Sequence, residues 1–166
     1  MNGVSIPVLD FTGTPSTPNR KVLTTGLIFV PGISKNGTAC TAADYNGVDA
    51  AGKVVLIKRG ACAFALKTTL AKTKGAVGVI IYNTADGELP GGSVGSGDLV
   101  PVGMISLTDG LGLVKRLQAG ETLSVDFMVD AIGEYRQTWN VIAETKGGDP
   151  KNVIVVCTHC FFSGLC

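Results

Sequence analysis

Short apolar runs alternate with polar, glycine-containing segments along most of the chain. Val22–Val30 ends in four apolar residues and stops at Pro31, which predicts a strand. Lys53–Arg59 has four apolar residues, mostly β-branched, between charged residues, and Ala76–Asn83 is another apolar run, so each is predicted to be a buried strand.

A helix is predicted over Ala61–Lys74, between the two buried strands. Ala63, Leu66 and Leu70 recur at spacings of three and four, and Gly75 suits the position just after a helix. A strand, a helix and a second strand form a compact βαβ unit, so the two strands are expected to be parallel neighbours.

The second half of the predicted domain contains a loop, a strand, a helix and a further strand. Thr84–Asp98 is a glycine-rich loop and Val100–Leu107 a strand. Thr108 is the expected N-cap of a short helix that Gly120 closes. In Thr122–Asp130 the apolar residues Leu123, Val125, Phe127 and Val129 alternate with Thr122, Ser124, Asp126 and Asp130 on the other face, which is typical of a half-exposed strand.

The two ends of the chain differ from this middle part. Residues 1–21 contain three prolines among small polar residues and are predicted to be an extended arm. Asn140–Glu144 and Asn152–Val156 are predicted to be two strands joined by a turn at Gly147–Pro150.

Charge and hydropathy exclude two classes of partner. Only 16% of the residues are charged and the formal net charge is +1, so the chain lacks the basic character that binds a phosphate backbone. No apolar run approaches the ~20 residues that cross a bilayer. The N-terminal residues show no signal-peptide pattern. We therefore expect no nucleic-acid partner and no membrane span.

The stretch from Gly52 to Gly78 carries the most specific pattern. It reads Gly-Lys-Val-Val-Leu-Ile-Lys-Arg-Gly-Ala-Cys-Ala-Phe-Ala-Leu-Lys, then Gly75-Ala-Val-Gly78, and continues as Ile80-Ile-Tyr-Asn83. It resembles the protease-associated domain of secreted and vacuolar peptidases over residues 22–132. The resemblance implies an α+β fold, in which a small mixed β-sheet or open barrel is flanked by two short helices.

The C-terminal residues resemble the entry into a zinc aminopeptidase domain of the aminopeptidase Y and fungal leucine aminopeptidase family. Thr138–Thr145 and Asn152–Val156 carry this likeness. His159 stands where the family has its first zinc ligand, but Phe161 replaces the aspartate that follows it there. We interpret residues 133–166 as the first strands of a truncated zinc peptidase domain with an aberrant tail.

A peptidase site cannot be built from this chain alone. His159 is its one histidine, whereas a zinc site takes three or four protein ligands. Cys157, Cys160 and Cys166 could complete such a site with His159, or they belong to an oxidation-prone tail. The chain is thus expected to be non-catalytic and free of cofactor, and zinc belongs to the parent family.

Two features depend on an oxidising compartment. The resemblance favours a disulfide between Cys40 and Cys62, and the alternative is two buried free thiols. Asn36-Gly37-Thr38 is a glycosylation acceptor. Both point to a secreted or vacuolar protein.

A peptide or anion contact is predicted where the two parallel strands end. Arg59 and Gly60 follow one strand and Asn83 ends the next, and ligands of open sheets bind at such ends. The alternative is a solvated turn with a capping arginine.

The resemblance implies a peptide- or protein-interaction module that governs substrate access to a peptidase, whose parent removes N-terminal residues from peptides. Expected partners are peptides, another protein or the missing peptidase domain. The alternative function is a free-standing binding module that resembles the luminal domain of a sorting receptor.

Overall fold

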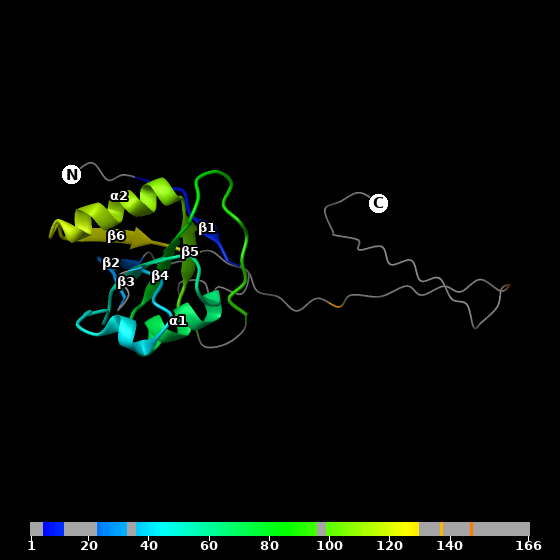
Figure 1. The fold of residues 1–166 in the computed structure, drawn as a ribbon, viewed down its shortest axis with the longest axis horizontal. Coiled ribbons are helices and arrows are strands. Elements are labelled where there is room, and N and C mark those ends of the chain that lie inside the picture. The colour runs from blue at the N-terminus through cyan, green and yellow to red at the C-terminus, as the bar shows by residue number, and fades with distance from the viewer. Residues whose placement is uncertain are drawn as a thin grey trace. The chain divides into compact units, whose positions relative to one another are not determined.

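The described residues up to position 129 form a six-stranded mixed sheet with one α-helix on each face (Figure 1). The computed structural model describes residues 5–11, 23–32, 36–95 and 99–129, together with Gln137 and Gly147. The chain divides into two units, Met1–Glu134 and Tyr135–Cys166, and the sheet belongs to the first. The predicted strands at Asn140–Glu144 and Asn152–Val156 lie outside the described residues.

The elements follow one another as a short strand, a second strand, a 3₁₀ helix and then alternating strands and helices. They are β1 (Leu9–Asp10), β2 (Leu23–Phe29), η2 (Ala42–Tyr45), β3 (Val54–Lys58), α1 (Phe64–Thr73), β4 (Gly78–Tyr82), β5 (Val102–Ile105), α2 (Leu107–Gln118) and β6 (Leu123–Phe127).

The strands lie in the order β1-β5-β4-β3-β2-β6. The four central strands are parallel, and the two edge strands β1 and β6 run antiparallel to their neighbours. The predicted parallel βαβ unit is present as β3, α1 and β4. The α+β class, with a mixed sheet flanked by two helices, is confirmed.

Alternate residues of each central strand feed two separate cores. Val55 and Ile57 of β3 pack in the same cluster as Ala71 of α1. Val54 and Leu56 of the same strand share the other cluster with Val114 of α2. Because side chains alternate along a strand, one buried strand supplies both helical layers.

The sheet curls strongly from β6 toward β5. A Cβ atom on Gly78 of β4 would lie 3.0 Å from the ring of Phe127 in β6, and one on Gly103 of β5 would lie 3.4 Å from the same ring. In a flat sheet three strand spacings, about 14 Å, would separate β6 from β4. The glycines leave the space that the Phe127 ring fills across the curled sheet.

The N-terminal segment adds a strand that the sequence pattern did not predict. Leu9 and Asp10 pair with Met104 and Gly103 of β5. The next residue, Phe11, is 3% exposed and its ring lies edge-on to that of Phe64, with 4.7 Å between the centroids. This contact ties the N-terminal segment to α1.

The predicted apolar face of the first helix is wrong. Leu66 is 43% exposed, whereas Lys67, Thr68 and Ala71 are fully buried and Phe64 is partly buried. The buried Thr68 hydroxyl donates a hydrogen bond to Ala65 O at 2.9 Å, so its polar group has a partner within the same helix. The helix therefore packs through a mixed face that a purely apolar pattern does not identify.

The second helix begins earlier than predicted. Ser106, and not Thr108, is the N-cap, and its hydroxyl oxygen accepts from Asp109 N at 3.0 Å. The backbone N–H and hydroxyl of Thr108 donate to Asp86 Oδ1 at 3.0 and 2.9 Å. The loop after β4 thereby caps α2 as well.

Candidate functional site

The carboxyl ends of β3 and β4 bring Arg59 and Asn83 together. Arg59 Nη1 donates to Asn83 Oδ1 at 3.0 Å, although 24 residues separate them in sequence. The parallel register that pairs Lys58 with Tyr82 places the two following residues side by side. Arg59 is partly exposed, so its guanidinium lies between the sheet edge and solvent.

Asn83 is the fixed member of this pair. Its side chain is 3% exposed, and its Oδ1 also accepts from Thr84 N at 2.9 Å. Its backbone N–H donates to Ile105 O at 3.0 Å. A buried amide with these bonds gives the Arg59 guanidinium a fixed hydrogen-bond partner. A guanidinium has five N–H donors, and the bond to Asn83 uses one of them.

An exposed turn with unusual backbone geometry follows Arg59. Gly60 has φ +102° and Ala61 has φ +66°, and both residues are exposed. A left-handed conformation is uncommon for alanine and is held here by its surroundings. The turn directs the chain from the end of β3 into Cys62 and the start of α1.

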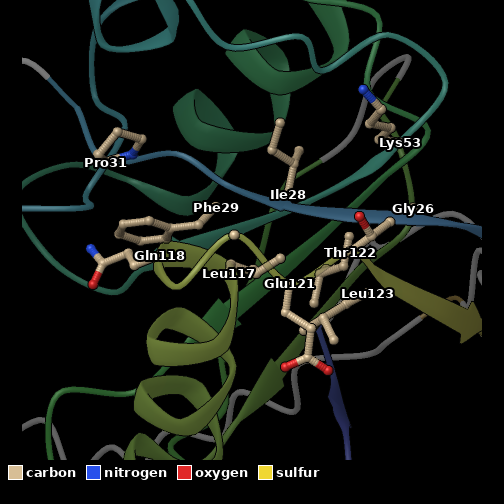
Figure 2. Close-up of a pocket in the computed structure, with 12 residues that line it drawn as sticks. Gly26, Ile28, Phe29, Pro31, Lys53, Leu117, Gln118, Glu121, Thr122 and Leu123 are labelled. Carbon is tan, nitrogen blue, oxygen red and sulfur yellow. The ribbon is translucent and has the colours of Figure 1, made fainter.

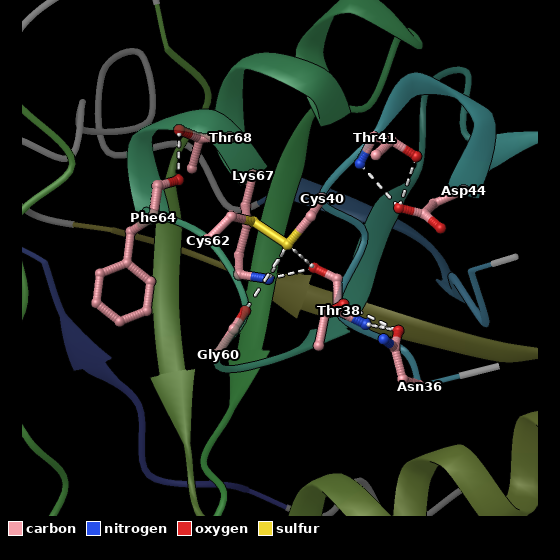
Figure 3. The surroundings of a disulfide bond; sticks show 10 residues. All are labelled: Asn36, Thr38, Cys40, Thr41, Asp44, Gly60, Cys62, Phe64, Lys67 and Thr68. Atoms are coloured by element: carbon pink, nitrogen blue, oxygen red, sulfur yellow. Dashed lines mark hydrogen bonds between the residues drawn. A yellow bond between two sulfur atoms is a disulfide. The ribbon is translucent and has the colours of Figure 1, made fainter. Parts of the chain in front are cut away.

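A disulfide holds this turn to the preceding loop (Figure 3). Cys40 and Cys62 are bonded through sulfur atoms 2.08 Å apart, with 5.9 Å between their Cα atoms. The bond closes a loop with a sequence separation of 22 residues, so the chain-entropy effect on stability is about 3 kcal/mol. The pairing that the resemblance implies is thus present in the structure.

Lys67 lies beneath the disulfide and is fully buried. Its ammonium group donates to the carbonyl oxygen of Thr38 and lies 3.6 Å from Cys40 Sγ (Figure 3). Burial lowers the pKa of Lys67 to about 8, and the charge of Asp44 partly opposes this shift. The sequence pattern gives no role to this lysine, because a lysine on a helix is normally exposed.

Asn36 is exposed and lies at the other end of the same loop. Its Oδ1 accepts from Thr38 N at 3.1 Å and from the Thr38 hydroxyl at 2.9 Å. The asparagine and threonine of the acceptor triplet are therefore in contact, in an Asx-turn arrangement. Glycosylation at Asn36 stays a prediction.

A second candidate surface is a groove of about 460 Å³ beside β2 (Figure 2). It exists because β2 pairs with β6 only as far as Leu27 opposite Leu123, while β2 continues to Phe29. The sequence pattern does not reveal this groove, since the groove depends on where two distant strands stop pairing. The groove is lined by Gly26, Leu27, Ile28, Phe29, Pro31, Lys53, Leu117, Gln118, Gly120, Glu121, Thr122 and Leu123.

The predicted metal-binding residues lie outside the described part of the chain. These are Cys157, His159, Cys160 and Cys166. Among the described residues, no group of three or more His, Cys, Asp and Glu side chains is arranged to hold a metal ion. No helix within the described ranges has the length and apolarity of a membrane span.

Comparison with known protein families gives a match over most of the sheet. The family model of the PA domain matches residues 24–113. A probable leucine aminopeptidase 2 of Aspergillus fumigatus is 41% identical over 128 residues, which are 75% of this chain and 25% of that protein. Leucine aminopeptidase 2 of Trichophyton rubrum is 41% identical over 129 residues, 76% of this chain and 25% of that protein.

Solved structures give the same picture. An aminopeptidase from Aneurinibacillus sp. strain AM-1 superimposes with a TM-score of 0.60 and 35% identity, over 71% of this chain and 26% of that one. A zinc aminopeptidase from Bacillus subtilis gives a TM-score of 0.57 and 30% identity, over 68% and 26%. The chain spans about a quarter of the length of the relatives it matches.

Proposed function

The chain belongs to the PA domain family, and we propose that it is a non-catalytic module which binds peptides and governs their access to the peptidase part of a secreted zinc aminopeptidase. In that parent protein, a peptidase domain with bound zinc removes N-terminal residues from peptides. The module supplies recognition and leaves the hydrolysis to the rest of the protein.

The observation that carries this proposal is the pair formed by Arg59 and Asn83 at the carboxyl ends of β3 and β4. A guanidinium that keeps one fixed bond to a buried amide is positioned to donate further hydrogen bonds. Peptide carboxylates accept such bonds in pairs. Exposed Gly60 follows Arg59 directly, so a peptide backbone meets no side chain there.

The similarity to aminopeptidases supports the choice of parent. The relatives named leucine aminopeptidase 2 align with three quarters of this chain, and a zinc aminopeptidase shares its fold. Such an enzyme needs several zinc ligands. In the proposal those ligands belong to the peptidase domain and not to the PA domain.

The disulfide and the acceptor triplet support an extracellular or vacuolar location. A bond between Cys40 and Cys62 persists in an oxidising compartment. Exposed Asn36 in contact with Thr38 suits addition of a glycan there. We place the protein outside the cytosol on these grounds.

Titration calorimetry of the full chain with a leucine-containing tetrapeptide tests the proposal. We expect binding that is weakened about tenfold by Arg59→Gln, because the charged bond to the peptide carboxylate is lost. Lys58→Gln is the matched control, since it removes the neighbouring positive charge at the end of β3. The amidated tetrapeptide should bind to the unsubstituted chain as weakly as the free acid binds to Arg59→Gln.

Two results would overturn the proposal. Equal loss of binding in Arg59→Gln and Lys58→Gln would show that net charge, and not the pair with Asn83, holds the peptide. Release of N-terminal leucine by the purified chain together with stoichiometric zinc would show that the chain is itself catalytic.

A further inference from the structure

Lys67 makes the two ends of the disulfide chemically different. Its ammonium group lies 3.6 Å from Cys40 Sγ, and of the two bonded sulfur atoms it is this one that the lysine contacts (Figure 3). Lys67 is fully buried, so neither water nor salt screens the contact well. A negative charge on Cys40 would be stabilised by this group far more than one on Cys62.

Two carbonyl groups also face Cys40 Sγ. Thr38 O lies 3.6 Å away and Gly60 O lies 3.8 Å away. These dipoles oppose a thiolate, but Thr38 O already accepts from the ammonium group of Lys67. A full positive charge at 3.6 Å outweighs two partial charges at the same range, so the net effect favours the thiolate of Cys40.

Burial does not distinguish the two cysteines, because both are partly buried. Cys62 lies between Ala61 and Ala63, which are both exposed. Cys40 lies between Ala39, which is fully buried, and Thr41, which is exposed. The difference between the two sulfur atoms therefore rests on the ammonium group of Lys67 beside Cys40 Sγ.

We propose that Cys62 is a site of modification by low-molecular-weight thiols, with Cys40 as the leaving group that Lys67 stabilises. A thiolate RS⁻ attacks Cys62 Sγ, a new bond forms between these two sulfur atoms, and the bond to Cys40 breaks. Cys40 takes the electron pair and remains as a thiolate paired with the ammonium group of Lys67. The proton of the thiol goes to solvent. A thiol that leaves as a stabilised thiolate leaves faster, so the attack is directed to Cys62.

The test uses the full chain with Cys157, Cys160 and Cys166 replaced by serine. The protein is exposed briefly to reduced glutathione at pH 7.5 and quenched with acid. Trypsin cleavage after Lys58 and Arg59 separates the two cysteines into different peptides. Mass spectrometry then measures the glutathione adduct on each. We expect the adduct on Cys62 to exceed that on Cys40 by about tenfold or more.

Substitutions at position 67 test the cause of the preference. Lys67→Met should bring the two adducts to near equality, whereas Lys67→Arg should keep the preference for Cys62. Lys74→Met, which removes an exposed positive charge just after the same helix, should change nothing. Predominant modification of Cys40 or equal modification of both cysteines in the protein with Lys67 intact would overturn the proposal. A preference for Cys62 that survives Lys67→Met in a folded protein would do the same.

Discussion

Gly110 of α2 lies directly against Tyr82 of β4. A Cβ atom on Gly110 would lie 2.1 Å from the Cβ of Tyr82, far inside any allowed contact. Tyr82 is 3% exposed and belongs to the core on this face of the sheet. The helix therefore approaches the sheet as closely as it does because position 110 has no side chain.

Replacing Gly110 by alanine should destabilise the protein by about 3 kcal/mol, because the helix must move away from β4 or Tyr82 must shift. Gly112→Ala is the matched control in the same helix. No atom lies within 4 Å of the Cβ position of Gly112, so this change should stabilise by roughly 0.5–1 kcal/mol. Urea denaturation measures the free energy of unfolding of both variants. If Gly110→Ala and Gly112→Ala change the stability by a similar amount in the same direction, the packing described here is contradicted.

The curl of the sheet should depend on the contact between Gly78 and Phe127. Gly78→Ala places a Cβ atom 3.0 Å from the Phe127 ring and 3.2 Å from Val54 Cγ2, which should cost about 1–3 kcal/mol. The same change should cost measurably less in a Phe127→Leu background, because the smaller side chain leaves room. A double-mutant cycle gives the coupling directly, and additive effects would exclude the contact.

The central strands could be predicted from the sequence because each is a continuous apolar run. Val55 and Leu56 point to opposite faces of the sheet and both are fully buried, so the pattern needs no knowledge of the fold. The strand at Leu9–Asp10 could not be predicted in the same way. It has two residues and depends on pairing with β5, which lies more than 90 residues later.

The candidate site was predictable only in part. Arg59 and Asn83 follow predicted neighbouring strands, so their proximity follows from the parallel register. The buried position of Lys67 was not predictable, because a lysine on a helix is normally exposed. Its burial depends on the carbonyl oxygen of Thr38 and on the sulfur of Cys40, which the fold brings beneath the helix.

The stability of the protein should rise between pH 7.5 and 9.5 because of Lys67. Its pKa is lowered to about 8 in the folded protein from 10.5 in the unfolded chain. The unfolded state therefore binds more protons in this range, and stability increases with pH, here by about 2 kcal/mol. Tyr82 opposes this only as the pH nears 10, because burial raises its pKa.

Urea denaturation at the two pH values measures this effect in the chain with Cys157, Cys160 and Cys166 replaced by serine. Lys67→Met should show no such rise, and Lys74→Met should behave as the unsubstituted chain does. A rise of equal size in Lys67→Met would assign the effect to another group.

Expression through a secretory pathway should attach a glycan to Asn36. The mass should fall on treatment with a peptide N-glycosidase, and Thr38→Ala should abolish the modification, because the hydroxyl that donates to Asn36 is lost. Thr41→Ala, which changes a nearby threonine outside the triplet, should leave the glycan in place. An unmodified protein secreted with its disulfide formed would refute the assignment.

The central claim is that this PA domain governs which peptides reach a peptidase site. It is tested most directly in a hybrid enzyme, in which residues 5–129 replace the matching segment of leucine aminopeptidase 2 from Aspergillus fumigatus. The measurement is KM for a leucine tetrapeptide with a free carboxylate and for leucine p-nitroanilide, which has none, with and without Arg59→Gln. We predict that Arg59→Gln raises KM for the tetrapeptide about tenfold and leaves KM for the anilide unchanged. If Arg59→Gln leaves KM unchanged for the tetrapeptide as well as for the anilide, the result contradicts the account and favours a free-standing binding module.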